Sequence, residues 1–130
     1  MQLKASTDYG LRAVLYLAAQ GGTCSSRDIA QGMSIPRDYL IQLAQLLRNA
    51  GIIEARPGKN GGYRLAKDPS EITLLQVIEA LDEDAKDSTR ERRDQRAHAA
   101  IAPDVRRAYE RVLESYVAYF EGMTLDQLFE

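Results

Sequence analysis

The architecture of this chain is set by residues 34–67, SIPRDYLIQLAQLLRNAGIIEARPGKNGGYRLAK. The first half of the stretch predicts a helix, because Ser34 is placed to cap it and Pro36 suits its first turn. Gly51 follows the last apolar position and predicts the helix end. One side of this helix has the apolar spacing expected for burial against a core, at Leu40, Leu43, Leu46 and Leu47. We therefore expect the opposite, polar side to face outward.

Two β-prone runs follow this helix, residues 52–56 and 63–67. The turn between them is rich in Gly and Asn, which is the composition of a β-hairpin. A helix with a polar exposed side that leads directly into a basic hairpin is typical of the recognition helix and wing of a winged-helix protein. We predict a mainly α fold with a small β-hairpin, a winged helix-turn-helix that binds double-stranded DNA.

Two further helices are predicted before this stretch. Residues 7–20 carry an apolar stripe at helical spacing, with Ser6 or Thr7 as the N-cap. The next helix starts at the serine pair 25–26 and is broken by Gly32. The helix that starts at residues 25–26 and the longer helix that follows Pro36 are joined by a tight turn that contains glycine. Such a pair of helices is the helix-turn-helix pattern.

The C-terminal half predicts two more helices around a polar segment. Thr73 caps the first, whereas Pro103 starts the second and Gly122 ends it. Thr124 then caps a last turn. Residues 82–97 have no apolar residue larger than alanine, so we expect an exposed loop or a weak helix there.

The helix that starts at residue 103 is apolar over more than half of its circumference, more than one contact side requires. We expect its second partner to be the same helix of another chain, since two-fold dimers are the commonest oligomers. The alternative is that it packs deep in its own domain. The expected dimerisation residues are Val105, Tyr109, Val112, Leu113, Tyr116, Val117 and Phe120. The chain thus divides into a winged-helix DNA-binding domain (1–82), a polar loop (83–102), and a dimerisation helix with a terminal turn (103–130).

Charge is distributed unevenly along the chain. The net charge is −2, yet residues 1–67 contain nine Lys/Arg and four Asp/Glu, net +5. Residues 68–130 contain eight Lys/Arg and fifteen Asp/Glu, net −7. Such asymmetry points to an anionic partner for the basic half, although two ordinary solvated surfaces would give the same totals.

The exposed side of the helix in residues 34–67 carries side chains that can read base edges. Arg37 suits guanine and Gln42 suits adenine in bidentate geometry, and Ile41 would contact a thymine methyl group. Arg48, late in the helix, is expected to contact phosphate or to satisfy the helix C-terminus. Basic residues of the hairpin would approach phosphates or enter a narrow minor groove. The expected DNA-binding residues are Ser34, Arg37, Asp38, Tyr39, Ile41, Gln42, Gln45, Arg48, Arg56, Lys59, Asn60 and Arg64.

The residue inventory argues against catalysis and against a metal site. The chain has one histidine, His98, and one cysteine, Cys24, so it can form neither an internal disulfide nor a multi-cysteine zinc site. Cys24 lies at an expected helix start, which can lower a thiol pKa, so it is either a redox sensor or a small residue that fills a helix junction. No apolar run reaches the roughly 20 residues that span a bilayer, and the N-terminus lacks a secretory signal, so we expect a cytoplasmic protein that contacts no membrane.

Two segments resemble the Rrf-two family of transcription regulators, the IscR, NsrR and CymR type. They are KASTDYGLRAVLYLA, from residue 4, and SSRDIAQGMSIPRDYLIQLAQLLRNAGIIEARPGKNGGYRLAKDPSEITLLQVIEALD, from residue 25. The resemblance is close over about residues 1–82 and holds in outline for the long helix. It implies a winged-helix homodimer, joined through the long C-terminal helix, that binds a roughly palindromic operator.

The chain departs from the pattern of that family in its loop and in its DNA-contact residues. Cluster-binding members place three cysteines in the loop that corresponds to residues 83–103, and this chain has none there. Because thiolates hold iron–sulfur clusters, and His98 with Asp8 cannot replace three of them, we expect no cluster and no cofactor. Relatives often carry Glu at the position of Ile41 and Arg at that of Pro57, so the operator preference cannot be transferred.

We therefore predict a sequence-specific, homodimeric transcriptional regulator, a repressor, that lacks an iron–sulfur cluster and enzymatic activity. Its effector is open: a small molecule, a partner protein or oxidation of Cys24. The alternative is a winged-helix protein-interaction module that has lost operator binding. A third hypothesis is a cluster sensor with unusual ligands.

Overall fold

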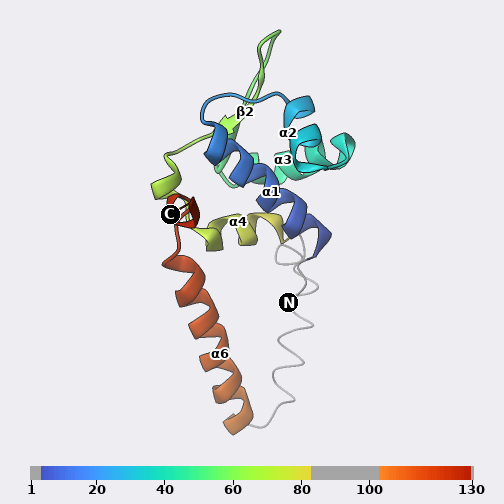
Figure 1. The fold of residues 1–130 in the computed structure, drawn as a ribbon. Helices are drawn as coiled ribbons and strands as arrows, with labels where there is room; N and C mark the ends of the chain where they lie inside the picture. Colours follow the sequence, from blue (N-terminus) through green and yellow to red (C-terminus); the bar gives the residue numbers. More distant parts are fainter. Residues whose placement is uncertain (1–3, 83–102, 130) are drawn as a thin grey trace.

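The computed structural model describes residues 4–82 and 103–129 (Figure 1). Within these residues the main body consists of α1 (Ala5–Gln20), α2 (Ser26–Met33), α3 (Arg37–Asn49), β1 (Ile53–Arg56), β2 (Gly62–Leu65), the 3₁₀ turn η1 (Pro69–Glu71) and α4 (Leu74–Leu81). The long helix α6 (Pro103–Glu121) and the 3₁₀ turn η3 (Asp126–Phe129) follow. This arrangement, mainly α with one antiparallel hairpin, is the predicted fold class.

The core lies where α1, α3 and α4 meet. The buried side of α3 is the one that its spacing predicted: Leu40, Leu43 and Leu47, with Leu46 half-buried beside them. Gly10 lets α1 approach α4 closely, because a Cβ there would lie 2.3 Å from the Leu81 side chain. Burial of these apolar sides fixes the direction in which the polar side of α3 points.

α1 begins earlier than the sequence predicted. Its first residue is Ala5, and Lys4 occupies the N-cap position without a side-chain hydrogen bond at that cap. Ser6 and Thr7, the predicted caps, lie inside the helix, and Thr7 is buried. Burial of the first turn therefore outweighs the preference of these hydroxyl residues for a cap.

α2 begins as predicted and ends later than predicted. Ser25 is the N-cap, and its hydroxyl accepts a hydrogen bond from the Asp28 backbone N–H at 3.0 Å. Gly32 does not break the helix, which continues to Met33. The glycine serves packing instead, because a Cβ at that position would lie 2.9 Å from the Tyr16 ring.

The turn between α2 and α3 differs from the prediction at Ser34. This residue adopts a left-handed conformation (φ 55°) and ends α2, so it does not cap α3. Pro36 occupies the N-cap position of α3, which no side chain caps. The end of α3 is as predicted, since Gly51 follows it with φ 76°.

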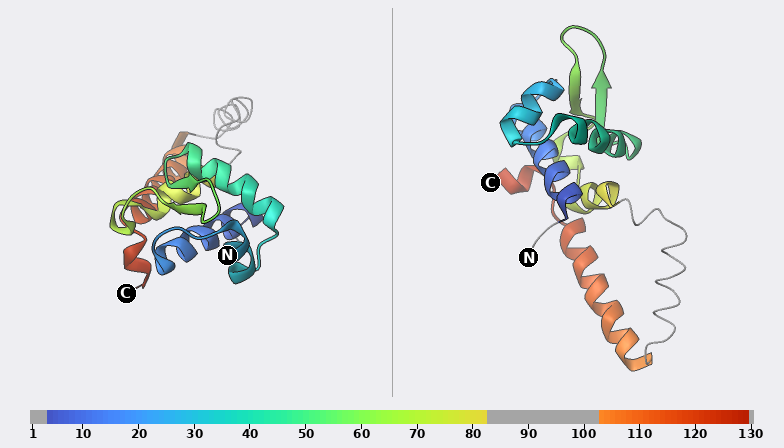
Figure 2. Two further views of the ribbon diagram at one scale, coloured as in Figure 1. Left: turned by 90° about the horizontal axis from the view of Figure 1, so that it is seen from above. Right: turned by 90° about the vertical axis from the view of Figure 1, so that its right-hand side faces the viewer.

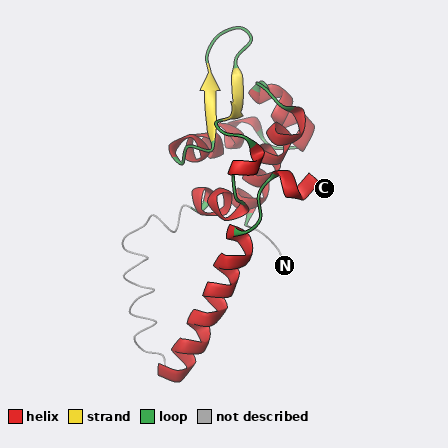
Figure 3. Ribbon diagram, turned by 90° about the vertical axis from the view of Figure 1, so that its left-hand side faces the viewer, coloured by secondary structure: helices red, strands yellow, loops and turns green. Residues whose placement is uncertain are grey.

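The hairpin is antiparallel, with Ile53 opposite Leu65 and Glu54 opposite Arg64. It extends beyond the helices at one end of the molecule (Figures 1 and 3). β1 begins one residue later than the predicted run 52–56. β2 begins one residue earlier than the run 63–67 and ends two residues earlier, because the pairing stops at Leu65. The hairpin can therefore contact a partner that the helices also touch.

α4 is held by a capping box at Thr73. The Thr73 hydroxyl accepts from the Gln76 backbone N–H at 3.2 Å, and the Gln76 side chain accepts from the Thr73 N–H at 3.0 Å. This arrangement satisfies two N–H groups at the helix start. The predicted cap is therefore confirmed.

α6 extends away from the main body, and the turn after it returns to the body (Figures 1 and 2). Leu125 is buried, and its N–H donates to the Ile72 carbonyl at 3.0 Å. Thr124, the predicted cap of the last turn, lies two residues before η3 begins, and its hydroxyl donates to the Asp126 carboxylate instead of accepting from a backbone N–H. Its backbone N–H donates to the Gln127 side chain at 3.2 Å. Among the described residues, no helix combines the length and the apolar character that a membrane span requires.

Candidate nucleic-acid interface

α3 lies at the same end of the molecule as the hairpin, remote from α6 (Figure 2). Ser34, Asp38 and Gln42 are exposed there. Ile41 lies among them with 45 % of its surface exposed. An exposed isoleucine on a polar helix side fits contact with an apolar group of a partner, such as the methyl group of thymine.

The last turns of α3 carry a chain of three exposed, hydrogen-bonded side chains. Gln45 Nε2 donates to Asn49 Oδ1 at 2.9 Å, and the Arg48 guanidinium donates to Gln45 Oε1 at 3.5 Å. These contacts hold the Arg48 charge near the C-terminal end of α3, where it interacts favourably with the helix dipole.

Tyr39 lies in the junction between α1 and α3 rather than on the open polar side. It is half-buried, and its ring packs edge-on against Tyr9 with centroids 5.6 Å apart. Arg12 lies over the Tyr9 ring at 5.2 Å and pairs with Asp8 at 2.9 Å. A further N–H of Arg12 donates to the Met33 carbonyl at 3.3 Å. Tyr39 therefore helps to orient α3 against α1. In the sequence, only the four-residue spacing of Asp8 and Arg12 indicated the ion pair of this cluster.

The tip of the hairpin carries the exposed residues Arg56, Lys59 and Asn60. Arg64, the fourth expected wing contact, is engaged within the wing. Its Nε donates to Glu54 Oε2 at 2.9 Å, and its second guanidinium nitrogen lies 2.9 Å from the same oxygen. The Arg64 charge is thus neutralised by a carboxylate directly across the hairpin, a pairing that the sequence analysis missed.

Cys24 joins the start of α2 to the root of the wing. Its backbone N–H donates to the Tyr63 carbonyl at 2.9 Å, and the Tyr63 N–H donates to the Cys24 carbonyl at 2.8 Å. Burial, and secondarily the Asp28 carboxylate, raises the pKa of the Cys24 thiol. A lowered pKa, on which the redox-sensor alternative relied, is thus not found, because desolvation of the thiolate outweighs the helix start. The residue fits the alternative role, that of a small side chain at a junction.

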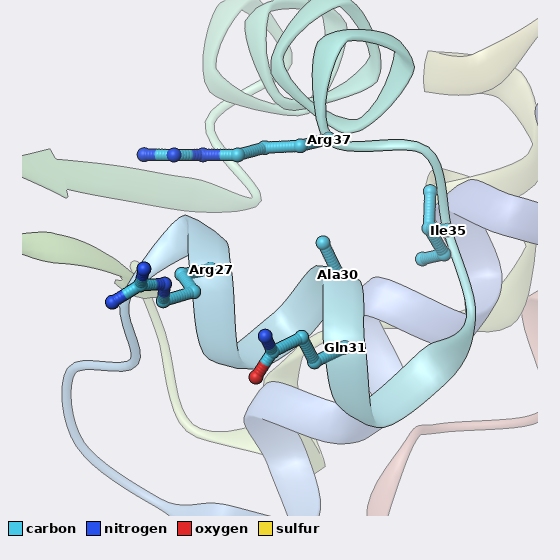
Figure 4. Close-up of a pocket in the computed structure, with 5 residues that line it drawn as sticks. All are labelled: Arg27, Ala30, Gln31, Ile35 and Arg37. Carbon is cyan, nitrogen blue, oxygen red and sulfur yellow. The ribbon is translucent and has the colours of Figure 1, made fainter.

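Two hollows flank α3, and each carries two arginines. The α2–α3 hollow, about 280 Å³, is lined by Arg27, Ala30, Gln31, Ile35 and Arg37 (Figure 4). The wing hollow, about 360 Å³, is lined by Ser26, Arg48, Ala55, Arg56, Pro57, Gly62 and Tyr63. The sequence analysis missed Ser26 and Arg27, since only the crossing of α2 with α3 brings them beside the predicted contacts.

The apolar stripe of α6 is described in part. Val105, Val112 and Val117 are exposed, by 55 %, 63 % and 39 %, and Phe120 is half-buried. The other expected dimerisation side chains lie outside the described residues: Tyr109, Leu113 and Tyr116. Three valines on the surface of one helix leave apolar area for a partner to cover.

A family model described as Rrf2, an iron-dependent transcriptional regulator, matches residues 3–130. The chain belongs to the Rrf2 family. A curated Synechocystis sp. protein, slr0846, named as a candidate HTH-type transcriptional regulator, is 42 % identical over 85 residues, 64 % of this chain and 58 % of the relative. The match thus spans less than two thirds of the length of that relative.

Solved structures of transcriptional regulators share this fold over nearly the whole chain. The IscR structure from T. potens has a TM-score of 0.78 at 25 % identity and covers 99 % of this chain and 86 % of its own. The structure of CymR, the global cysteine regulator of B. subtilis, has a TM-score of 0.78 at 27 % identity, with 98 % and 95 % covered. A transcriptional regulator from Listeria innocua reaches 0.80 at 30 % identity, with 99 % and 86 % covered.

These findings confirm the predicted family and fold class. The chain has the winged-helix fold of the Rrf2 family, and the relatives that it matches are named as transcriptional regulators, not as enzymes. The interface described above is therefore the surface on which DNA contacts are expected.

The donor set of this chain does not fit an iron–sulfur cluster. The only cysteine in the sequence is Cys24, and it lies half-buried at the root of the wing. Among residues 4–82 and 103–129, no group of three or more His, Cys, Asp and Glu side chains could hold a metal ion. His98 and the loop at 83–102 lie outside the described residues. A cluster bound by several thiolates from one chain cannot be assembled from a single thiol.

Proposed function

We propose that this Rrf2 protein is a sequence-specific, homodimeric repressor that binds a palindromic operator without an iron–sulfur cluster. The observation that carries the proposal is that α3 and the hairpin lie at one end of the molecule (Figure 2), where the polar residues of α3 and the basic residues of the hairpin tip are exposed. That arrangement suits a helix in the major groove and a wing beside it. A regulator of this kind acts on chromosomal DNA in the cytoplasm. The effector that controls it is a small molecule, a partner protein or oxidation of Cys24.

Ile41 and Gln42 are proposed to read base edges, because both are exposed on the open side of α3. The wing hollow, with Arg48 and Arg56, would take backbone phosphate between the major-groove helix and the wing. Lys59, at the exposed hairpin tip, would enter or border the flanking minor groove. These roles divide the interface into residues that specify sequence and residues that position the protein.

The proposed dimer places two copies of α6 against each other and two α3 helices about 10 base pairs apart. The exposed valines of α6 support this arrangement. Val112→Glu should yield monomers, measured by light scattering after size-exclusion chromatography. Ala118→Glu is the matched control, since it adds the same carboxylate to an exposed position on the opposite side of α6. Dimers of unchanged stability in the Val112→Glu protein would refute this interface.

The absence of a cluster is tested by anaerobic reconstitution with iron and sulfide. The purified chain should remain colourless and bind no stoichiometric iron, because one thiol cannot hold a cluster. Stoichiometric iron and sulfide with visible absorption would establish the third hypothesis, a cluster sensor with unusual ligands.

In vitro selection from random-sequence duplexes tests the regulator itself. Recovery of a palindromic consensus, bound with an affinity that falls steeply as salt rises, is the expected result. A protein-interaction module that has lost operator binding would enrich no consensus. It would also bind duplexes of any sequence equally weakly.

A further inference from the structure

The α2–α3 hollow combines two guanidinium groups from different helices. Arg27 comes from the first turn of α2 and Arg37 is the first residue of α3. Figure 4 shows both side chains extending toward the same side of the hollow. Arg37 Nε donates to the Ser26 hydroxyl at 3.2 Å, which draws this guanidinium back toward α2. Arg37 is therefore directed away from the row of exposed residues on α3 that suits base reading.

These two arginines differ from the two that stabilise the domain. Arg12 and Arg64 are each paired with a carboxylate at 2.9 Å. Among the described residues, by contrast, no carboxylate lies within ion-pair distance of Arg27 or Arg37. Both are exposed, so their charges remain available to an anion.

The hydrogen bond between Arg37 and Ser26 links the two hollows into one basic path. Ser26, whose hydroxyl holds Arg37, also lines the wing hollow with Arg48 and Arg56. The path therefore runs from the start of α2, past α3, to the root of the wing. The backbone of one strand of a DNA duplex can follow such a path, because its phosphates are regularly spaced anions.

We propose that the α2–α3 hollow seats one backbone phosphate of the operator, held by Arg27 and Arg37. This inference rests on the proposed function and deepens it: Arg37 positions the protein on the backbone instead of reading guanine, and Arg27 is an additional DNA contact. Planar guanidinium groups suit a phosphodiester, since each can donate two parallel N–H bonds to its oxygens. Phosphate contacts fix the register of a recognition helix without carrying sequence information.

The test compares Arg27→Gln and Arg37→Gln in the full chain with wild type, on the selected duplex and on an unrelated duplex. Each variant should weaken both affinities by a similar factor and flatten the slope of log Kobs against log salt by about 0.9. The ratio of the two affinities should stay unchanged. Arg107→Gln, which removes an exposed arginine of α6, is the matched control and should change neither quantity.

A charge-deletion series locates the contact. In this series of duplexes one phosphate at a time is replaced by a neutral methylphosphonate. At one position per half-site the replacement should weaken binding by wild type but should not weaken further the binding by Arg27→Gln or Arg37→Gln. A changed affinity ratio in Arg37→Gln, with an unaltered salt slope, would instead establish base reading and overturn the proposal. An unchanged affinity in Arg27→Gln would overturn it as well. If Gln42→Ala lowers the affinity ratio in the same assays, the proposed function stands even where this inference fails.

Inorganic phosphate distinguishes the DNA backbone from a free anion. Calorimetric titration of the protein without DNA should show no saturable binding at micromolar phosphate, because a free phosphate in this one hollow lacks the other contacts of the DNA interface. Micromolar binding that both arginine variants abolish would assign the hollow to a small anionic effector and overturn its assignment to the operator.

Discussion

Glu54→Gln should strengthen DNA binding through the neighbouring Arg64. In the structure both guanidinium contacts of Arg64 go to one oxygen of Glu54, at 2.9 Å. Glutamine keeps the shape of the side chain and removes its charge. The substitution therefore releases Arg64 for a phosphate and removes a carboxylate that phosphates repel.

The magnitude follows from the exposure of the pair. The two side chains are 38 % and 49 % exposed, and ion pairs of that exposure contribute about 0.2–1 kcal/mol. Glu54→Gln should then lower the free energy of unfolding by no more than about 1 kcal/mol. One added phosphate contact makes the slope of log Kobs against log salt steeper by about 0.9. A rise from about 50 to about 200 mM salt should weaken the variant about 3.5-fold more than wild type.

Fluorescence anisotropy with a labelled duplex, repeated across a salt series, measures both quantities. Glu71→Gln on η1 is the control, because it makes the same charge change at an exposed position outside the wing. If Glu54→Gln and Glu71→Gln strengthen DNA binding equally, the change in net charge alone explains the effect. That result would refute the role of the Arg64–Glu54 pair. An unchanged slope in Glu54→Gln would refute it directly.

Gly62→Ala should lower the free energy of unfolding by more than about 2 kcal/mol, because φ is 150° and the new Cβ would lie 2.1 Å from the Cys24 carbonyl oxygen. Gly22→Ala, with φ 71° and open space, isolates the conformational part of that loss, and equal losses in urea melts would contradict the steric account. Thr73→Ala should cost about 0.5–2 kcal/mol by breaking the capping box, and Thr73→Ser should restore most of it. Iodoacetamide should modify Cys24 with a pH midpoint above that of a free cysteine, because burial raises the pKa of this thiol. A midpoint below the free value would show that the helix start dominates after all.

Local sequence signals determined the elements that hold the interface. The leucine spacing of α3 predicted its buried side, because a helix repeats every 3.6 residues wherever it lies. Ser25 and Thr73 were recognisable as caps, since a cap depends on residues within one turn. Gly51 likewise ended α3 as predicted.

Tertiary contacts decided how the individual side chains are used. Ser34 ends α2 and Gly32 continues it, because the α1–α2 packing and the path into α3 outweigh their turn propensities. Tyr39 turns into the junction with α1, where the Tyr9 ring receives it. Cys24 has a raised thiol pKa because it is partly buried where its backbone pairs with Tyr63 of the wing.

The sequence by itself determined a winged helix with a polar recognition helix and a basic N-terminal half. Only the tertiary structure decided which of its arginines are available to DNA. Arg64 is neutralised because the strand register places Glu54 opposite it, and a shift of one residue would separate them. Arg37 turns toward Ser26, eleven residues away, because α2 crosses beside the start of α3. Such pairings depend on distances between elements, which the residue spacing along one element does not contain.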